Sequence, residues 1–528
     1  MSGLAVSARG VDETLLGRLV ADRVASRLGA GDATLWGPAA EEEAAIRLGW
    51  VRLHETSRPL LAELDALTSD VRAARLDRVV LCGMGGSSLA PEVITRTAGV
   101  ELTVLDTTDP GPVRDAVEQR LDRTVVVVSS KSGTTVETDG QRRAFDAAFR
   151  AAGIDPSSRF VVVTDPGSAL ADLAASAGYR RVFLADPSVG GRYSALTAFG
   201  LVPSALAGVD VSSLLDEAAQ AAPDLFTDDP ENPALVLAAA LGGGVAHGRD
   251  KVALADAGSG IVGFADWAEQ LVAESTGKDG TGVLPVVLSG PDEPELQWGA
   301  ADVLCGVLGS APVSDPGVTL NGPLGAQFLL WECATAVAGR VIGINPFDQP
   351  DVESAKKAAR GLLDSRPTPE LPAFVDGAVE VRGSDVLLDG ANTADDAVAA
   401  LLAQLPSNGY LAVMAYLDRE GPDAALADVR RPLAQRTGRP VTFGWGPRFL
   451  HSTGQYHKGG SPTGVFLQIT GASSEDLPIP DLPFSFGELI AAQAAGDAQV
   501  LAGHGRPVLR LHLTDRAAGV ARLLEVLR

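Results

Sequence analysis

Cysteine is scarce in this sequence: Cys82, Cys305 and Cys333 are the only three among 528 residues. They are odd in number and far apart, and no CxxC pair occurs. A disulfide framework and a cysteine-based zinc site are therefore excluded. Histidine and the acidic residues are not grouped with the spacing of metal ligands either, so we expect no metal and no other cofactor.

Positive charge is also in deficit, because 43 lysine and arginine residues face 67 aspartate and glutamate residues, a formal net charge of −24. Proteins that bind nucleic acid need a basic face, and anionic membranes attract basic surfaces. We therefore expect neither nucleic acid nor a membrane as a partner. A small anionic ligand is compatible with this balance, because a single pocket can be positive on an acidic protein.

Long hydrophobic runs are missing as well. The most apolar long segment, residues 233–245, contains glycine and is too short to cross a bilayer. Residues 1–16 lack the basic and apolar regions of a secretory signal, so the expected location is the cytoplasm. Hydrophobic residues nevertheless make up 46% of the chain, which excludes disorder and allows about three or four domains.

What the sequence does contain, from residue 76 onward, is a series of short β-branched runs that alternate with helical stretches. Such continuous apolar runs are typical of parallel strands that helices cover on both faces. The pattern predicts an α/β fold of doubly wound parallel sheets. The expected strands are residues 78–82, 102–105, 124–128, 160–163 and 181–184 in a first sheet, 251–254, 283–288 and 340–344 in a second, and 410–417, 441–445, 465–469 and 508–513 in a third.

Composition also marks domain boundaries. An acidic, proline-punctuated stretch lies at residues 224–233, and a proline-rich stretch that is typical of a linker lies at 365–372. The predicted regions are an N-terminal helical segment (1–75), two α/β domains (76–220 and 221–366) and a C-terminal α/β region (367–528).

A glycine-rich turn, Cys82–Leu89 (CGMGGSSL), follows the first expected strand and should open a helix. Glycines permit close approach of a ligand, and a helix N-terminus favours an anion. The turn approximates the dinucleotide fingerprint, and Asp106 ends the next strand where a ribose-binding acid would lie. A nicotinamide-dependent dehydrogenase is therefore one interpretation, although Ser88 stands where that fingerprint has its third glycine.

A second loop, Ser129–Thr135 (SSKSGTT), follows the expected strand 124–128. Its dense hydroxyl groups, backbone N–H groups and single lysine suit the oxygens of a phosphate monoester. A dinucleotide site needs no such second loop, and a helix cap needs only one serine or threonine. The loop therefore favours a phosphorylated ligand.

The two loops together resemble the paired loops of the sugar isomerase (SIS) fold. Three further segments are similar to motifs of the glucose-6-phosphate isomerase family: Gly190–Ser194 (GGRYS), Ala273–Lys278 (AESTGK) and Asn345–Lys356 (NPFDQPDVESAK). The five motifs keep the family's order and cover about half the chain. A loop at His451–Gly460 (HSTGQYHKGG) makes the resemblance closest to the actinobacterial-type and transaldolase-fused branch.

The resemblance implies two SIS domains and an aldose–ketose isomerase of glycolysis and gluconeogenesis that interconverts glucose 6-phosphate and fructose 6-phosphate. The reaction opens the sugar ring and passes through a cis-enediolate, so it needs a base, a cation beside the oxyanion and a ring-opening acid. By resemblance, Glu274 is the base, Arg192 stabilises the enediolate and Lys356 assists ring opening. Lys357 follows directly, and only the motif selects Lys356.

The same resemblance assigns phosphate and substrate binding to other positions. Gln270 lies one helical turn before Glu274 and could face the same cleft. The binding positions implied by the motifs are Gly86, Ser87, Ser130, Lys131, Ser132, Thr135 and Gln349.

The sequence departs from the family in its histidines. In longer members a ring-opening histidine from the neighbouring subunit lies between the glutamate and lysine motifs, but none occurs here between Glu274 and Lys356. Our hypothesis is that the C-terminal region supplies His457, with His451 as the second choice. The resemblance implies a homodimer, and a histidine from the C-terminal region would relax that dependence.

Two alternatives within the SIS fold stay open: an isomerase that also accepts other 6-phosphate sugars such as mannose 6-phosphate, and a sugar-phosphate-binding protein without catalysis. The joint presence of Glu274, Gln349 and Lys356 argues against the second.

Overall fold

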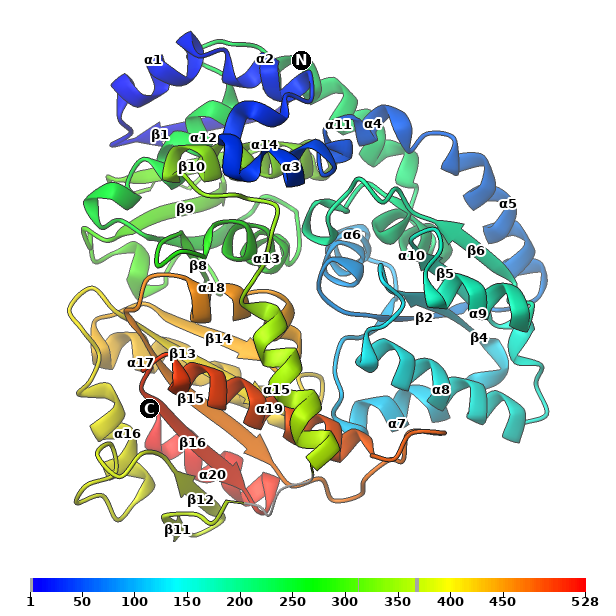
Figure 1. Ribbon diagram of the computed structural model, residues 1–528, viewed down its shortest axis with the longest axis vertical. Coiled ribbons are helices and arrows are strands. Elements are labelled where there is room, and N and C mark those ends of the chain that lie inside the picture. Colours follow the sequence, from blue (N-terminus) through cyan, green and yellow to red (C-terminus); the bar gives the residue numbers. More distant parts are fainter. Residues whose placement is uncertain (1–2, 312, 366–369) are drawn as a thin grey trace.

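Three α/β units, each built on its own sheet, make up the computed structural model, which describes residues 3–311, 313–365 and 370–528 (Figure 1). The predicted linker and boundary at residues 366–369 lie outside the described residues. No helix in the described ranges is long and apolar enough to cross a membrane.

The first sheet is entirely parallel, with strand order β3-β2-β4-β5-β6. In β2, Val79 and Leu81 face one core, whereas Val80 and Cys82 face a second core on the other side of the sheet. This double burial explains the unbroken apolar runs and confirms all five predicted strands. Their bounds are β2 Arg78–Gly83, β3 Thr103–Leu105, β4 Thr124–Ser129, β5 Phe160–Thr164 and β6 Arg181–Leu184. The helices of this unit are α6 Leu89–Ala98, α7 Pro110–Glu118, α8 Val136–Ala151, α9 Ala169–Ala177 and α10 Ala198–Ala207.

The second sheet has the order β1-β10-β9-β7-β8. Its strands are β7 Lys251–Ala257, β8 Leu284–Val287, β9 Val303–Gly309, β10 Gly317–Asn321 and β1 Ala5–Arg9, and its helices are α11 Val211–Leu225, α12 Pro233–Gly242, α13 Phe264–Thr276, α14 Leu324–Ile342 and α15 Val352–Ser365. The strand predicted at 340–344 is wrong, because those residues end the buried helix α14. The N-terminal segment is not purely helical, since β1 pairs antiparallel with β10. Its helices are α1 Glu13–Ala21, α2 Val24–Gly29, α3 Pro38–Ala45, α4 Leu53–Thr56 and α5 Leu60–Ala73.

The C-terminal region forms a sheet of order β11-β12-β16-β15-β13-β14. The four predicted strands are present and parallel, while an unpredicted hairpin, β11–β12, pairs antiparallel at one edge. The strands are β11 Phe374–Asp376, β12 Val379–Arg382, β13 Tyr410–Tyr416, β14 Val441–Trp445, β15 Gly464–Gly471 and β16 Val508–Leu513. The helices are α16 Ala394–Leu402, α17 Arg430–Thr437, α18 Gly454–Gly459, α19 Phe486–Gly503 and α20 Arg516–Val526.

The C-terminal region packs against both other units. One hydrophobic cluster joins Ala253 and Val286 of the second sheet to Met414 and Phe466 of the third. Buried ion pairs add to this contact, among them Arg430 with Glu293 and Glu295. The region is therefore an integral part of the molecule, and its segment from Arg448 to α18 contacts both other units.

Candidate active site

Three loops converge at the glycine-rich turn after β2. Gly85 has a left-handed φ of +56°, and a Cβ atom there would lie 2.7 Å from Gln270 Nε2 and 3.0 Å from His451 Cβ. A Cβ atom on Gly86 would lie 2.0 Å from the carbonyl oxygen of Gly191. The turn thus requires glycine because the second domain and the C-terminal region approach its backbone so closely.

The hydroxyl-rich loop after β4 ends at the N-terminus of α8, where Thr135 is the residue before the helix. Ser130 Oγ donates to Thr135 Oγ1 at 3.1 Å, and the Ser132 and Thr134 hydroxyl oxygens lie 2.9 Å apart. Ser87, from the glycine-rich turn, is partly exposed. The structure therefore places the hydroxyl groups of the loop after β4 at a helix N-terminus, where backbone N–H groups favour an anion.

Lys131 directs its charge away from this loop. Its Nζ lies 2.7 Å from Asp165 Oδ2, so a carboxylate already compensates the ammonium group. The contribution of Lys131 that best fits an anion is therefore its backbone N–H group.

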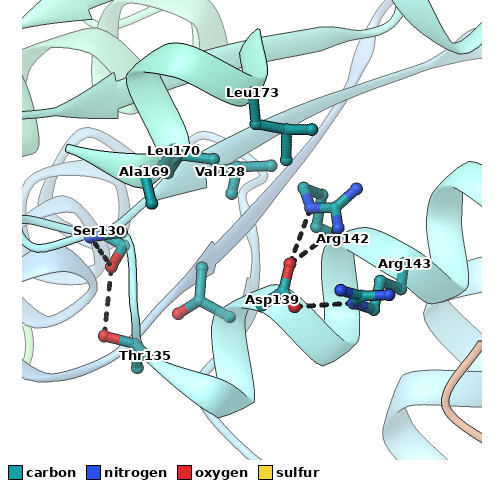
Figure 2. A pocket seen from close by; sticks show the side chains of 11 residues that line it. Val128, Ser130, Thr135, Asp139, Arg142, Arg143, Ala169, Leu170 and Leu173 are labelled. Carbon is teal, nitrogen blue, oxygen red and sulfur yellow. Dashed lines mark hydrogen bonds and ion pairs between the residues drawn. The ribbon is translucent and has the colours of Figure 1, made fainter. Parts of the chain in front are cut away.

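A hollow behind the loop is lined by Ser130 and Thr135 on one side and by polar residues of α8 on the other (Figure 2). There Asp139 lies between two arginines: Arg142 Nη2 is 2.7 Å from its Oδ1, and Arg143 Nε is 2.7 Å from its Oδ2. Because one carboxylate pairs with both guanidinium groups, the hydroxyl loop is the better anion site.

Glu274 lies on α13 and is only 4% exposed. Its Oε2 is 3.7 Å from Arg192 Nη1 and 3.4 Å from Gln270 Nε2. Burial raises the pKa of Glu274, while Arg192, His451 and Lys356 act in the opposite direction. A buried carboxylate with a raised pKa beside a permanent cation is suited to abstract a proton from carbon.

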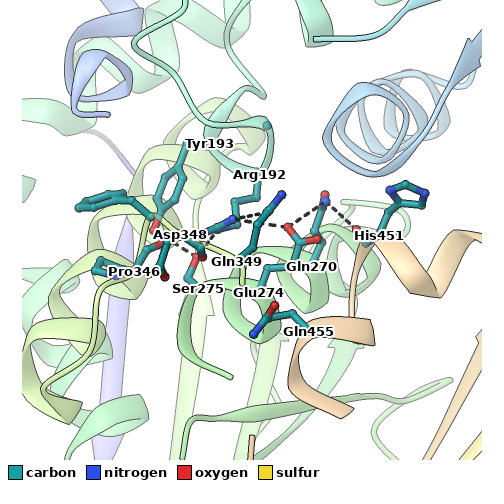
Figure 3. A network of polar contacts seen from close by, with 12 residues as sticks. Arg192, Tyr193, Gln270, Glu274, Ser275, Pro346, Asp348, Gln349, His451 and Gln455 are labelled. Carbon is teal, nitrogen blue, oxygen red and sulfur yellow. Dashed lines mark hydrogen bonds and ion pairs between the residues drawn. The ribbon is translucent and has the colours of Figure 1, made fainter. Parts of the chain in front are cut away.

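Arg192 is fixed by four hydrogen bonds (Figure 3). Its Nε donates to Ser275 Oγ at 2.9 Å and its Nη1 to Gln349 Oε1 at 2.7 Å. Its Nη2 donates to the carbonyl oxygens of Pro346 and Asp348, at 2.8 and 2.9 Å. The guanidinium group is thus held rigidly beside Glu274, and Gln349 is brought into the same network.

Lys278, the last residue of the AESTGK motif, has a structural contact. Its Nζ lies 2.7 Å from the carbonyl oxygens of Asn345 and Asp348 and from Asp348 Oδ1. Burial lowers its pKa to about 8. Lys278 therefore fixes the turn that carries Gln349, a role the sequence did not indicate.

Lys356 lies on an exposed face of α15, as does Lys357. The charge of Lys356 opposes the rise that burial causes in the pKa of Glu274 and of Glu137, so Lys356 lies near both carboxylates. Gln455 of α18 holds the start of this helix, because it accepts a hydrogen bond from the Asp351 N–H group at 3.0 Å.

The histidine that faces the cleft is His451. Its Nε2 is 3.2 Å from Oε1 of Glu137, which also accepts a hydrogen bond from Gln493 Nε2 at 2.7 Å. Burial alone would raise the pKa of Glu137, but the hydrogen bond from His451 reverses this and the pKa falls below its usual value. In the sequence, Glu137 is marked only as an acidic residue in the first turn of the helix after the hydroxyl loop, which does not identify it as a functional residue.

The structure corrects the hypothesis that His457 is the ring-opening histidine. Its side chain is 3% exposed and packs among the rings of Tyr410, Phe449 and Phe466. Neither ring nitrogen has a hydrogen-bond partner among the described residues, and burial lowers the pKa of His457 well below its usual value. The short helix α18 turns this residue into the core, so it faces no ligand.

Asp106, the expected ribose-binding acid of a dehydrogenase, is buried and ion-paired. Arg448 contacts its Oδ2, and Arg419 Nε lies 3.4 Å from its Oδ1. This carboxylate therefore binds the C-terminal region, which removes the main support for a dinucleotide site. No group of three or more potential metal ligands occurs in the described part of the chain.

Comparison with known proteins agrees with these motifs. Residues 67–289 match the family model described as phosphoglucose isomerase. A probable glucose-6-phosphate isomerase from Natronomonas pharaonis is 31% identical over 391 residues, which cover 63% of this chain and 90% of that protein. The chain belongs to the glucose-6-phosphate isomerase family. A family member from Cyanothece sp. is 30% identical over 351 residues, and the match covers 54% of this chain and 65% of that protein.

Solved structures of similar fold include a hypothetical protein from Thermus thermophilus, with a TM-score of 0.59 and 25% identity. The match covers 68% of this chain and 99% of that one. A glucose-6-phosphate isomerase from Chlamydia trachomatis matches with a TM-score of 0.57 and 22% identity, over 70% of this chain and 90% of that one. The predicted α/β family fold is therefore confirmed, while the branch within the family stays a prediction.

Proposed function

We propose that this protein interconverts glucose 6-phosphate and fructose 6-phosphate through a cis-enediolate. Membership of the family supports the reaction. The single observation that carries it is the placement of the buried Glu274 beside Arg192, where the charges of His451 and Lys356 also act on its carboxyl group. A cytoplasmic place in glycolysis and gluconeogenesis follows from these substrates.

The phosphate group is held at the N-terminus of α8. The hydroxyl groups that contact it are those of Ser87, Ser130, Ser132 and Thr135, while Gly86 and Lys131 contribute N–H groups. Charge-assisted hydrogen bonds of this kind anchor the sugar so that its first two carbons reach Glu274.

Ring opening falls to His451. The hemiacetal opens when its hydroxyl proton is removed and the ring oxygen is protonated, so an acid–base group is needed at that oxygen. Glu137 holds His451 by Nε2, which directs the other nitrogen, Nδ1, to the sugar. Lys356, whose charge acts on both Glu137 and Glu274, assists this step.

Glu274 then moves the proton between C2 and C1. It takes the C2 proton of the open aldose and returns it to C1, and the reverse reaction starts at C1. The electron pair released at carbon collects on the enediolate oxygen, where the fixed charge of Arg192 stabilises it. Gln349 and Gln270 orient the sugar hydroxyl groups around this carbon pair.

The direct test is fructose 6-phosphate conversion, read out by a coupled glucose-6-phosphate dehydrogenase assay, for wild type and Glu274→Gln. We expect kcat to fall by about 10²- to 10⁴-fold, because a positioned base contributes that much. Thermal unfolding controls for folding. Turnover near the wild-type value in Glu274→Gln would reject this base. Turnover of mannose 6-phosphate in the same assay shows how far the enzyme accepts the opposite configuration at C2.

A further inference from the structure

We propose that Glu269 is a positioning residue that holds His451 in place for ring opening. This inference rests on the proposed function, in which His451 opens the sugar ring. Glu269 lies outside the motifs that carry the family resemblance, five residues before Glu274 on α13.

Two neighbouring residues of α13 bind two neighbouring residues of the histidine segment. Ser452 Oγ donates to Glu269 Oε2 at 2.7 Å, and Gln270 Nε2 donates to the carbonyl oxygen of His451 at 2.7 Å. The helix that carries the base therefore holds the backbone of His451, as Figure 3 shows for Gln270. It also holds the side chain of the next residue, Ser452.

The segment Arg448–Ser452, which carries His451, is also held on its other sides. Arg448, three residues earlier, is ion-paired with Glu92 at 2.6 Å and with Asp106. Gly85 lies so close that an added Cβ would be 3.0 Å from His451 Cβ. Loss of the Glu269 contact leaves Gln270 to hold the segment to α13, which weakens its position, and a shift of about 1 Å is enough to cost a hundredfold in rate.

The charge state of Glu269 defines the variant that should preserve the contact. Ser452, Asp266 and Arg448 surround its carboxyl group, and burial at the interface raises its pKa to about 8. At neutral pH it is therefore a neutral acid that accepts a hydrogen bond from Ser452 through one oxygen. Glutamine has the same shape and the same acceptor, so Glu269→Gln should retain the contact.

The experiment compares a cyclic substrate with one that cannot close. Fructose 6-phosphate needs ring opening, whereas 5-deoxyfructose 6-phosphate lacks the hydroxyl that forms the ring and stays open. For Glu269→Ala we expect kcat on fructose 6-phosphate to fall by about 10- to 100-fold, with the open substrate unchanged within about twofold. Glu269→Gln should restore turnover of the cyclic substrate. Equal losses on both substrates, or no loss on either, would overturn the proposal.

Two further variants keep the test decisive. Ser452→Ala removes the same hydrogen bond from the other side and should give the same selective loss, even where Glu269→Ala folds poorly. Arg439→Ala breaks an ion pair with Asp302 at the same domain interface but at the amino end of β7, so it should affect both substrates alike. A selective loss in Arg439→Ala would show that general loosening, and not Glu269, explains the effect.

His451→Ala distinguishes a failure of the ring-opening role of His451 from a failure of the positioning role of Glu269. It should lose turnover of the cyclic substrate and retain turnover of the open one. If it shows no such selectivity, the assignment of ring opening to His451 fails and the role of Glu269 fails with it. If His451→Ala is selective but Glu269→Ala and Ser452→Ala are not, only the positioning role is wrong.

Discussion

Glu269 and Glu274 lie on the same helix, and burial raises the pKa of both carboxyl groups. Their neighbours differ. Glu274 faces Arg192, His451 and Lys356, which favour its charged form, whereas Glu269 has Asp266 beside it, which disfavours charge. One residue type thus supplies a reactive base at one position and a neutral hydrogen-bond acceptor at the other.

The raised pKa of Glu269 predicts how stability depends on pH. The folded protein binds a proton at Glu269 up to about pH 8, whereas the ordinary value is 4.5, so the free energy of unfolding falls as pH rises through this range. Glu269→Gln has no carboxyl group that titrates at this position, so its free energy of unfolding does not fall in this way. Its melting temperature relative to wild type should therefore increase from pH 5 to pH 8 and then level off, as measured by thermal unfolding. A difference that does not change with pH would contradict the prediction.

The motif residues could be predicted because each motif is a short continuous stretch of sequence. Glu274, Arg192 and Gln349 indeed lie together. The His451–Glu137 pair could not be predicted, since 314 positions separate the two residues and only the packing of the C-terminal region brings them together. The glycine-rich loop around His457 is typical of a ligand site, yet α18 buries the His457 side chain.

At the scale of elements, the segment Arg448–Ser452 is held by both SIS units. Arg448 binds Glu92 of α6 and Asp106 after β3, while His451 and Ser452 bind α13. A 3₁₀ turn of this length has little stability of its own. Its geometry therefore depends on these anchors.

Removal of Arg448 should weaken the whole molecule. Arg448→Ala leaves Arg419 as the remaining buried arginine beside Glu92 and Asp106, so we expect the lower end of the about 3–5 kcal/mol that breaking a buried ion pair costs. Arg114→Ala is the matched control, because its partner Glu475 also lies in the C-terminal region but is 77% exposed, so we expect about 1 kcal/mol or less. Urea unfolding measures both. Equal costs for the two variants would contradict the buried role of Arg448.

Strands with two buried faces were the elements best predicted, as β2 and β4 illustrate. The error at 340–344 has a physical reason: α14 is buried on every side over most of its length, so its apolar last residues resemble a buried strand in composition. Strand β1 was missed because it is short and lies at the edge of a sheet formed by residues far along the chain.

At the scale of the molecule, the proposed site takes its groups from both SIS units and from the C-terminal region. The homodimer that the resemblance implies stays a prediction. In the proposed function, the packing of the C-terminal region on the other two units serves to place His451.

Mixing two inactive variants tests this arrangement. Because Glu274 and His451 belong to one site of one chain, a mixture of Glu274→Gln and His451→Ala subunits should show no more activity than the separate variants. A site shared between two subunits would instead restore about a quarter of wild-type activity, since half the subunit pairs would be mixed and each would hold one intact site. Steady-state turnover after unfolding and refolding the mixture gives the answer.

The central claim is that Glu274 carries a proton between C1 and C2. The most direct measurement follows deuterium from D₂O into C2 of glucose 6-phosphate by NMR during the conversion of fructose 6-phosphate. We predict incorporation with wild type, and a rate of incorporation that falls with turnover by about 10²- to 10⁴-fold in Glu274→Gln. Incorporation in Glu274→Gln at a rate near that of wild type would contradict the account.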